Sequence, residues 1–125
     1  MKAAMKLEKS SPSPLSFVEN SRISSITFAP GYVQFHFDGP CLNAYVWPKI
    51  KFDKDVIKRF DSSYTDSLIE LVGKTLISAH VDPYESITLE LDDQICLEIS
   101  LHGEDLVKGE AAMLQDSSGK IWEVW

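Results

Sequence analysis

Three histidines are the first residues of this 125-residue chain to consider for acid–base chemistry or metal binding. His36, His80 and His102 lie on the polar side of alternating apolar–polar segments or at the end of one, which predicts exposed positions on strands. Their spacing forms no local metal motif, and neither HExxH nor CxxC occurs in the sequence. The sequence therefore assigns no metal, no cofactor and no catalytic residue.

The acidic residues and the cysteines also lack a recognisable catalytic arrangement. A carboxylate pair could be chosen among the acids at positions 85–98, but any acidic sheet face offers such pairs. The sequence contains neither a GxSxG nucleophile motif nor a P-loop. Cys41 and Cys96 have no histidine beside them and are expected to be free thiols that pack as small apolar groups. These observations favour a protein that is not an enzyme, although a site assembled from distant strands would leave no linear motif.

Four aromatic residues are placed where predicted strands end. Tyr45 and Trp47 close the first predicted hairpin, and Trp122 and Trp125 close the chain. Tryptophan and tyrosine are enriched at the centres of protein interfaces. Small domains also need large side chains to fill their own interior, and core burial is the more frequent outcome for such residues. The four aromatics and the three histidines together form the predicted partner or pocket surface.

The elements that position these residues follow from a two-residue apolar rhythm in both flanking parts of the chain. In Tyr32–Phe37, Val33, Phe35 and Phe37 share one face, and turn residues then lead to a second alternating strand ending at Val46. The same pattern predicts the remaining strands at 23–28, 77–81, 87–91, 95–101, 111–115 and 121–124. In the strand at 77–81, Ile77, Ala79 and Val81 are expected on the apolar face.

The centre of the chain has a helical rhythm instead. Asp53 is a plausible N-cap for a short helix whose apolar side would carry Val56, Ile57 and Phe60. Ser63, with an aspartate three residues later, resembles a capping box for a second helix over 63–73, and Gly73 suits its left-handed end. The centre is therefore predicted to form two short helices, or one helix broken near Asp61-Ser62.

The predicted fold class is α+β: two antiparallel meanders or hairpins flank a central helical segment in a bent-sheet roll or sandwich. The two strand regions also resemble each other. Phe35–Gly39 aligns with Leu89–Asp93, and Leu42–Val46 then aligns with Ile95–Ile99 after a slip in the turn. An internal duplication and the generic similarity of half-buried hairpins explain this resemblance equally well.

Length and composition predict one folded domain. Residues 1–14 end in Ser10-Ser11-Pro12-Ser13-Pro14 and are expected to be a flexible lead-in, with a single α+β domain over 15–125. The lead-in lacks the apolar core of a secretory signal, so a cytoplasmic location is expected. The formal net charge of −7 disfavours binding to nucleic acid or to anionic membrane, because both reward clustered lysine and arginine.

The leading functional hypothesis is a non-enzymatic protein-interaction or homodimeric module that uses its aromatic strand ends and open sheet edges. The alternative is a small-molecule-binding domain or enzyme with a pocket between the sheet and the helices. The two hypotheses differ in an observable way. The pocket hypothesis requires His36, Tyr45, His80 and His102 to converge on one cavity, whereas the interaction hypothesis leaves them dispersed.

Overall fold

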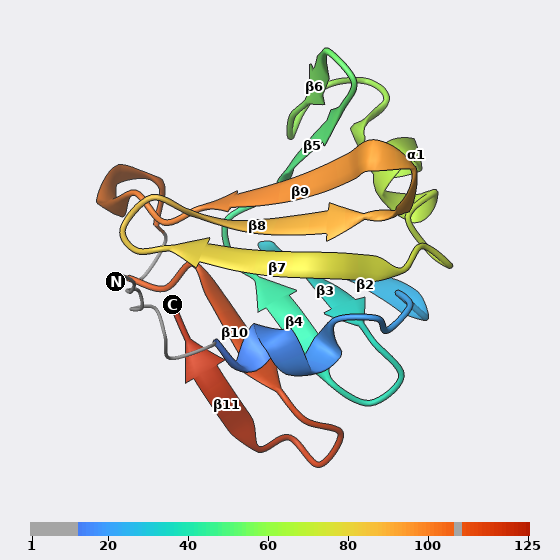
Figure 1. Ribbon diagram of the computed structural model, residues 1–125. Coiled ribbons are helices and arrows are strands. Elements are labelled where there is room, and N and C mark those ends of the chain that lie inside the picture. The colour runs from blue at the N-terminus through green and yellow to red at the C-terminus, as the bar shows by residue number, and fades with distance from the viewer. Residues whose placement is uncertain (1–12, 107–108) are drawn as a thin grey trace, which may run out of the picture.

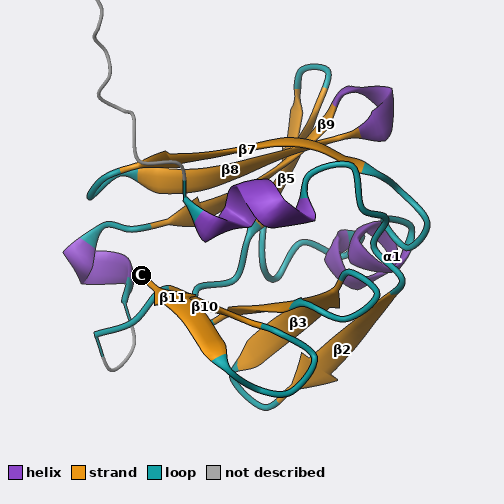
Figure 2. Ribbon diagram, turned by 60° about the horizontal axis from the view of Figure 1, so that its bottom comes forward, coloured by secondary structure: helices purple, strands orange, loops and turns teal. Residues whose placement is uncertain are grey.

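The protein is built from two five-stranded antiparallel sheets that face each other (Figures 1 and 2). The structure, a computed structural model, describes residues 13–106 and 109–125. The first sheet contains β2 (Ser25–Ala29), β3 (Tyr32–His36), β4 (Cys41–Ala44), β10 (Ala112–Gln115) and β11 (Ile121–Val124). The second contains β5 (Lys49–Phe52), β6 (Asp55–Ile57), β7 (Leu76–Asp82), β8 (Ser86–Leu91) and β9 (Ile95–Ser100).

Helical structure is short. The chain contains the 3₁₀ turns η1 (Pro14–Val18), η2 (Asp92–Gln94) and η3 (Gly103–Asp105), and the α-helix α1 (Tyr64–Ile69). The fold is therefore mostly β and closer to an all-β sandwich than to the α+β class that the sequence predicts. No helix in the described part of the chain is long and apolar enough to cross a membrane.

Each sheet is a three-stranded meander completed by a hairpin from elsewhere in the chain. The strand orders are β11-β10-β4-β3-β2 and β6-β5-β9-β8-β7. The β5–β6 hairpin follows β4 in sequence but pairs with β9, and the β10–β11 hairpin follows β9 but pairs with β4. The two meanders thus exchange hairpins, and the chain crosses from one sheet to the other twice.

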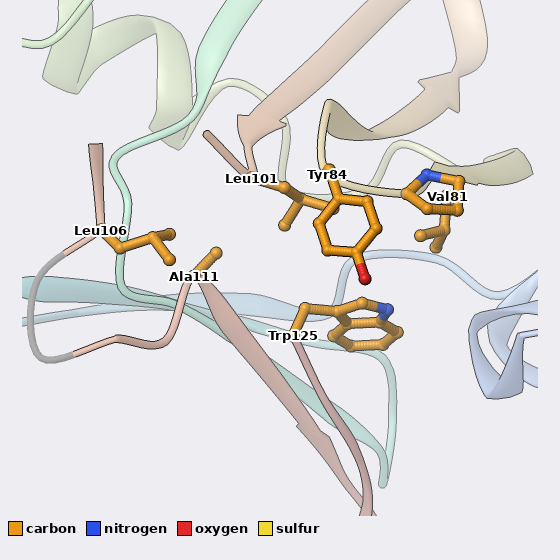
Figure 3. Close-up of a pocket in the computed structure, with 7 residues that line it drawn as sticks. Val81, Tyr84, Leu101, Leu106, Ala111 and Trp125 are labelled. Carbon is orange, nitrogen blue, oxygen red and sulfur yellow. The ribbon is translucent and has the colours of Figure 1, made fainter. Parts of the chain in front are cut away.

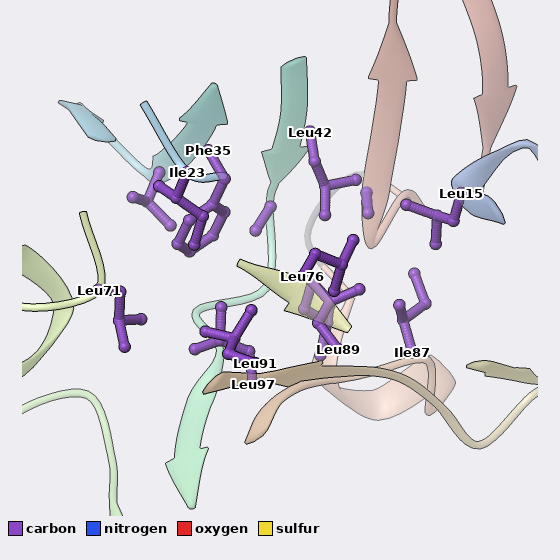
Figure 4. Close-up of a cluster of buried hydrophobic side chains, with 14 of the residues drawn as sticks. Leu15, Ile23, Phe35, Leu42, Leu71, Leu76, Ile87, Leu89, Leu91 and Leu97 are labelled. Atoms are coloured by element: carbon purple, nitrogen blue, oxygen red, sulfur yellow. The ribbon is translucent and has the colours of Figure 1, made fainter. Parts of the chain in front are cut away.

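The core lies between the sheets, where the alternating apolar residues of both meanders meet (Figure 4). Val33, Phe35 and Phe37 are buried, as the two-residue rhythm predicts. The predicted faces of β8 and β9 are confirmed at Ile87, Leu89, Leu91, Leu97 and Ile99, all of which are buried. Leu15 and Val18 of η1 are buried against the same core. The prediction of a flexible lead-in falls, for residues 1–12, outside the described part of the chain.

The first predicted helix is wrong. Residues 49–57 form the β5–β6 hairpin, in which Ile50 pairs with Ile57 and Lys51 with Val56. Asp53 is the turn residue, at φ 57°, and not an N-cap. Val56, Ile57 and Phe60 have a spacing that suits one side of a helix, but β5 satisfies the backbone of this segment through strand pairing. Phe60 is 88% exposed.

The second predicted helix is shorter than expected. α1 covers six residues, and Ser63 occupies its N-cap position without a side-chain hydrogen bond, so the predicted capping box is not formed. Gly73 has the predicted left-handed conformation, at φ 94°, three residues beyond the helix C-cap at Glu70.

Strand β7 departs from simple alternation at its start. Its register with β8 shifts between Leu76 and Ser78, so Ile77 is an extra residue without a partner. Leu76 is fully buried, whereas Ile77 is 50% exposed. The predicted inward position of Ile77 is therefore wrong, while Ala79 and Val81 do pack against the core.

A short antiparallel contact joins the two sheets where β2 and β7 approach each other. Arg22 and Thr75 form an isolated bridge. Four backbone hydrogen bonds surround it in two matched pairs: Ile23 N to Lys74 O (2.9 Å) with Leu76 N to Ser21 O (2.8 Å), and Gly73 N to Ile23 O (2.8 Å) with Asn20 N to Leu76 O (2.6 Å). Within each pair, the two bonds join corresponding residues, but the donor of one bond and the donor of the other come from opposite halves of the chain. The contact therefore has a local two-fold arrangement.

Candidate functional site: an apolar pocket beside Trp125

The three predicted histidines do not converge. The His36 ring lies 3.0 Å from the Thr27 hydroxyl on the first sheet, and His80 is exposed on β7. His102 follows β9, and its Nε2 lies 3.0 Å from a carboxylate oxygen of Glu85. Within residues 13–106 and 109–125, no three side chains of histidine, cysteine, aspartate or glutamate could hold a metal ion together.

Three of the four predicted aromatic residues lie in separate contacts. Tyr45 packs on Tyr32, with 5.4 Å between ring centroids. Trp47 meets Tyr64 edge-on at 6.4 Å, and the guanidinium of Arg59 lies 4.1 Å from its ring centroid. Trp122 meets the exposed ring of Phe17 edge-on at 5.9 Å. These residues therefore do not form one surface.

Trp125 lines a pocket at one end of the sandwich, between the two sheets (Figure 3). The pocket has a volume of about 370 Å³ and is lined almost entirely by apolar atoms. Its walls come from the end of β7 and the β7–β8 turn, from the segments after β9 and η3, and from residues that flank β10 and β11. The lining residues are Val81, Pro83, Tyr84, Leu101, Leu106, Ala111 and Trp125.

Local structure explains how the two aromatic rings reach this pocket. Tyr84 lies in the turn between β7 and β8 at φ 65°, and its side chain is 86% exposed. In Figure 3 its hydroxyl points towards the indole of Trp125. Trp125 is held by backbone bonds: its N–H donates to Ala112 O (2.9 Å) and its carbonyl accepts from Ala111 N (2.6 Å). The indole is thus anchored to the sheet, while the tyrosine stands at the solvent side of the pocket.

Polar residues gather in a second, smaller cavity of about 180 Å³ at the same end of the second sheet. It is lined by Glu85, His102, Ser100, Asp105, Lys49, Glu98 and Ser86. The hydrogen bond that His102 donates to Glu85, together with the negative charges nearby, raises the pKa of His102. The Ser100 hydroxyl donates to Asp105 (2.6 Å) and is therefore directed at a carboxylate and not at the imidazole. This arrangement is a set of ion pairs and hydrogen bonds and lacks the serine–histidine bond of a nucleophilic site.

The two cysteines are free thiols, as predicted. Burial is the main cause that raises the pKa of both Cys41 and Cys96, which disfavours the reactive thiolate. Cys41 is buried and its sulfur lies 3.4 Å from the Asn43 side-chain oxygen. Neither thiol lines the Trp125 pocket.

Sequence reasoning identified one residue of the pocket, Trp125, and missed the others. Leu101 and Val81 were predicted only as core residues of strands. Tyr84 carried the one available signal, because a large aromatic residue in a proline turn has no strand face to bury it. Ala111 and Leu106 carried none, since their role depends on how the chain returns from the second sheet to the first.

Comparisons with known proteins found no match: no family model, no curated protein and no solved structure matches the chain.

Proposed function

We propose that this protein is a non-enzymatic interaction module that receives an apolar side chain of a protein partner in the Trp125 pocket. One observation carries the proposal: the pocket is open and apolar, while the polar side chains at the same end of the second sheet line a separate cavity and are bonded to one another. An apolar pocket edged by an exposed tyrosine is the usual setting for the anchor residue of a protein interface.

The neighbouring strand supports a protein partner. β11 is an edge strand of the first sheet. Because Trp125 donates to Ala112 O and its carbonyl accepts from both Ala111 N and Ala112 N, the N–H and C=O of the preceding residue Val124 point away from β10. An extended segment could pair with this edge and place a side chain in the pocket. The net charge of −7 favours a basic partner through long-range attraction.

A peptide selection tests this function. A phage-displayed library is panned on the wild-type protein, with counter-selection on Leu106→Arg, which places a charge at the pocket wall. We expect the surviving peptides to share one bulky apolar residue flanked by lysine or arginine. Binding should fall at least about tenfold in Tyr84→Ala, because the exposed ring at the pocket is lost.

Phe60→Ala is the matched control, since Phe60 is as exposed as Tyr84 but lies in the connection from β6 to α1. Its affinity for the selected peptides should equal that of the wild type. Recovery of no pocket-dependent peptide, or equal losses in both variants, would contradict the proposal. Light scattering over a concentration series tests the homodimeric form of the hypothesis, for which a dimer is expected that Tyr84→Ala dissociates.

A small apolar molecule is the second candidate occupant, favoured by the pocket volume of about 370 Å³, which falls within the range of small-molecule sites. A thermal-shift screen with metabolites tests it. A ligand at about 100 times its dissociation constant adds about 2.7 kcal/mol to the free energy of unfolding, and Leu106→Arg should abolish that gain.

We also propose that the two halves of the chain are copies of one unit. In the first meander Phe35 pairs with Leu42, and in the second Leu89 pairs with Leu97. This register aligns Leu42 with Leu97 and corrects the sequence alignment, which placed Leu42 opposite Ile95. The same register aligns further buried pairs, Val33 with Ile87 and Ala44 with Ile99, and, when continued to the ends of the strands, Phe37 with Leu91. The reciprocal hydrogen bonds around Arg22 and Thr75 align Ile23 with Leu76, which are also buried.

The match continues outside the meanders. Leu15 and Val18 of η1 precede Ile23 by the same number of residues as Leu68 and Leu71 precede Leu76, and all four are buried. The reciprocal hydrogen bonds around Arg22 and Thr75 relate these segments by a two-fold operation, and the exchanged hairpins obey the same operation. Generic alternation would explain matching strands, but it does not require matching crossings between the sheets.

A further inference from the structure

We infer that the Trp125 pocket is shaped for an aromatic side chain of the partner, because the chain fills the corresponding place in its first half with its own Trp47. This inference rests on the proposed function and on the proposed repeat, and it names the chemistry of the anchor. Strand register supplies the correspondence. Ile50 pairs with Leu97, and Leu114 pairs with Leu42, so Ile50 and Leu114 are equivalent. Three residues earlier in each copy lie Trp47 and Ala111.

The residues around these two positions correspond as well. Ile57 pairs with Ile50 as Glu123 pairs with Leu114, so Ile57 and Glu123 are counterparts. Two residues after each of them lie Arg59 and Trp125, which are therefore counterparts as well. The pocket residue Val81 corresponds to Phe28, since these residues pair with Ile87 and Val33 respectively. Leu101 lies two residues after Ile99, and Val46 lies two residues after Ala44, so Leu101 corresponds to Val46. Both copies also have a proline in the preceding turn, Pro83 and Pro30.

The first copy is closed by an indole. Trp47 is partly buried against the core and meets Tyr64 edge-on, while the Arg59 guanidinium covers its face at 4.1 Å. The second copy has a methyl group at that place, because Ala111 stands where Trp47 stands, and Ala111 is fully buried at the inner side of the pocket. A methyl group in place of an indole at this position accounts for a cavity in one copy at a place that is filled in the other.

The occupant is therefore a planar aromatic side chain supplied in trans. Tyr84 and Trp125 offer two rings beside the cavity, and aromatic pairs gain more from stacked or edge-on contact than from buried area alone. An aliphatic anchor would forgo that gain. The negative net charge of the protein further favours an aromatic residue with basic neighbours in the partner sequence.

Titration of the full-length protein with two model compounds tests the inference. N-acetyl-tryptophanamide and N-acetyl-leucinamide are added separately, and ¹H–¹⁵N spectra follow the amides of Leu101 and Ala111 and the indole N–H of Trp125. We expect the tryptophan compound to bind at these residues about 3- to 10-fold tighter than the leucine compound. Equal affinity, or shifts located elsewhere, would overturn the inference.

Two substitutions fill or open the two places. Ala111→Trp copies the first half into the second and should reduce binding of N-acetyl-tryptophanamide more than about tenfold. Trp47→Ala should create a second site, whose occupation by the same compound raises the melting temperature of that variant more than that of the wild type. Unchanged binding in Ala111→Trp, with a dispersed wild-type-like spectrum, would refute the correspondence.

Tyr84→Ala tests the same pocket if Ala111→Trp fails to fold, because an exposed turn residue can be truncated without disturbing the core. It should weaken binding of the aromatic compound, while Phe60→Ala leaves it unchanged.

The peptide selection distinguishes failure of this inference from failure of the proposed function. Pocket-dependent peptides with leucine or isoleucine anchors would sustain the interaction module and overturn only the aromatic anchor.

Discussion

At the scale of single residues, the most consequential polar contacts are structural. Tyr64 is buried at the start of α1, and its hydroxyl donates a hydrogen bond to the Pro48 carbonyl. Burial raises the pKa of Tyr64, so the phenol stays protonated and remains a donor. This bond ties the helix to the segment through which the chain first crosses between sheets.

Tyr64→Phe is predicted to lower the free energy of unfolding by about 1–3 kcal/mol, because it leaves a buried carbonyl without its partner. Urea denaturation measures the change. Tyr84→Phe is the control and should stay within about 0.5 kcal/mol of the wild type, since Tyr84 is 86% exposed. A neutral Tyr64→Phe would show that water replaces the lost donor.

The Glu85–His102 pair predicts a pH effect on stability. Its hydrogen bond raises the pKa of His102 above its usual value of 6.5. The stabilisation is therefore complete below that unfolded-state value and is lost as pH rises through the folded-state pKa. We expect Glu85→Gln to destabilise the protein more at about pH 5.5 than at about pH 8. Thermal unfolding in matched buffers measures this, and a larger loss at high pH would contradict the assignment.

At the scale of elements, the bulge at the start of β7 decides which of two adjacent apolar residues belongs to the core. Leu76 is buried in the cluster between the sheets, whereas Ile77 is half exposed. Leu76→Ala is predicted to lower the free energy of unfolding by about 2–5 kcal/mol, through lost apolar contact and the cavity left behind.

Ile77→Ala supplies the comparison on the same strand and should cost less than about 1 kcal/mol, because much of its side chain already contacts water. Chemical denaturation of both variants orders the two effects. The reverse order would place the register shift elsewhere in the strand.

These elements also show how far sequence reasoning reached. The meander strands were predictable because each presents one apolar face, as at Val33 and Phe35, and a two-residue period identifies such a face. The β5–β6 hairpin was not, because its strands are short and Val56 and Ile57 are adjacent, a spacing that a helix also allows. The pocket was hidden for a further reason: Ala111 and Tyr84 come to line one pocket only through the packing of the two sheets, and local patterns hold no information on that packing or on strand order.

At the scale of the whole molecule, the exchanged hairpins make each sheet depend on both halves of the chain. Leu42 and Leu97 are fully buried, and each pairs with the exchanged hairpin of its sheet, Leu42 with Leu114 and Leu97 with Ile50. Leu42→Ala and Leu97→Ala are each predicted to lower the free energy of unfolding by about 2–5 kcal/mol. Both variants should also unfold in a single transition, because each sheet contains a hairpin from the other half of the chain and cannot persist once that half unfolds.

Two probes check this cooperativity. Trp47 lies in the first half and Trp122 in the second, so fluorescence from single-tryptophan variants reports each half separately. Coincident unfolding curves are expected in the wild type and in both leucine variants. Separate midpoints would mean that the halves are independent units.

The exchange of hairpins also constrains the order of events during synthesis on the ribosome. β5 leaves the exit tunnel long before its partner β9, and β4 must wait for β10, which follows β9 in sequence. Pairings between such distant segments form late and slowly. The nascent chain therefore presents an unprotected strand edge at β4 until β10 has been synthesised, the stage at which a holding chaperone would be needed.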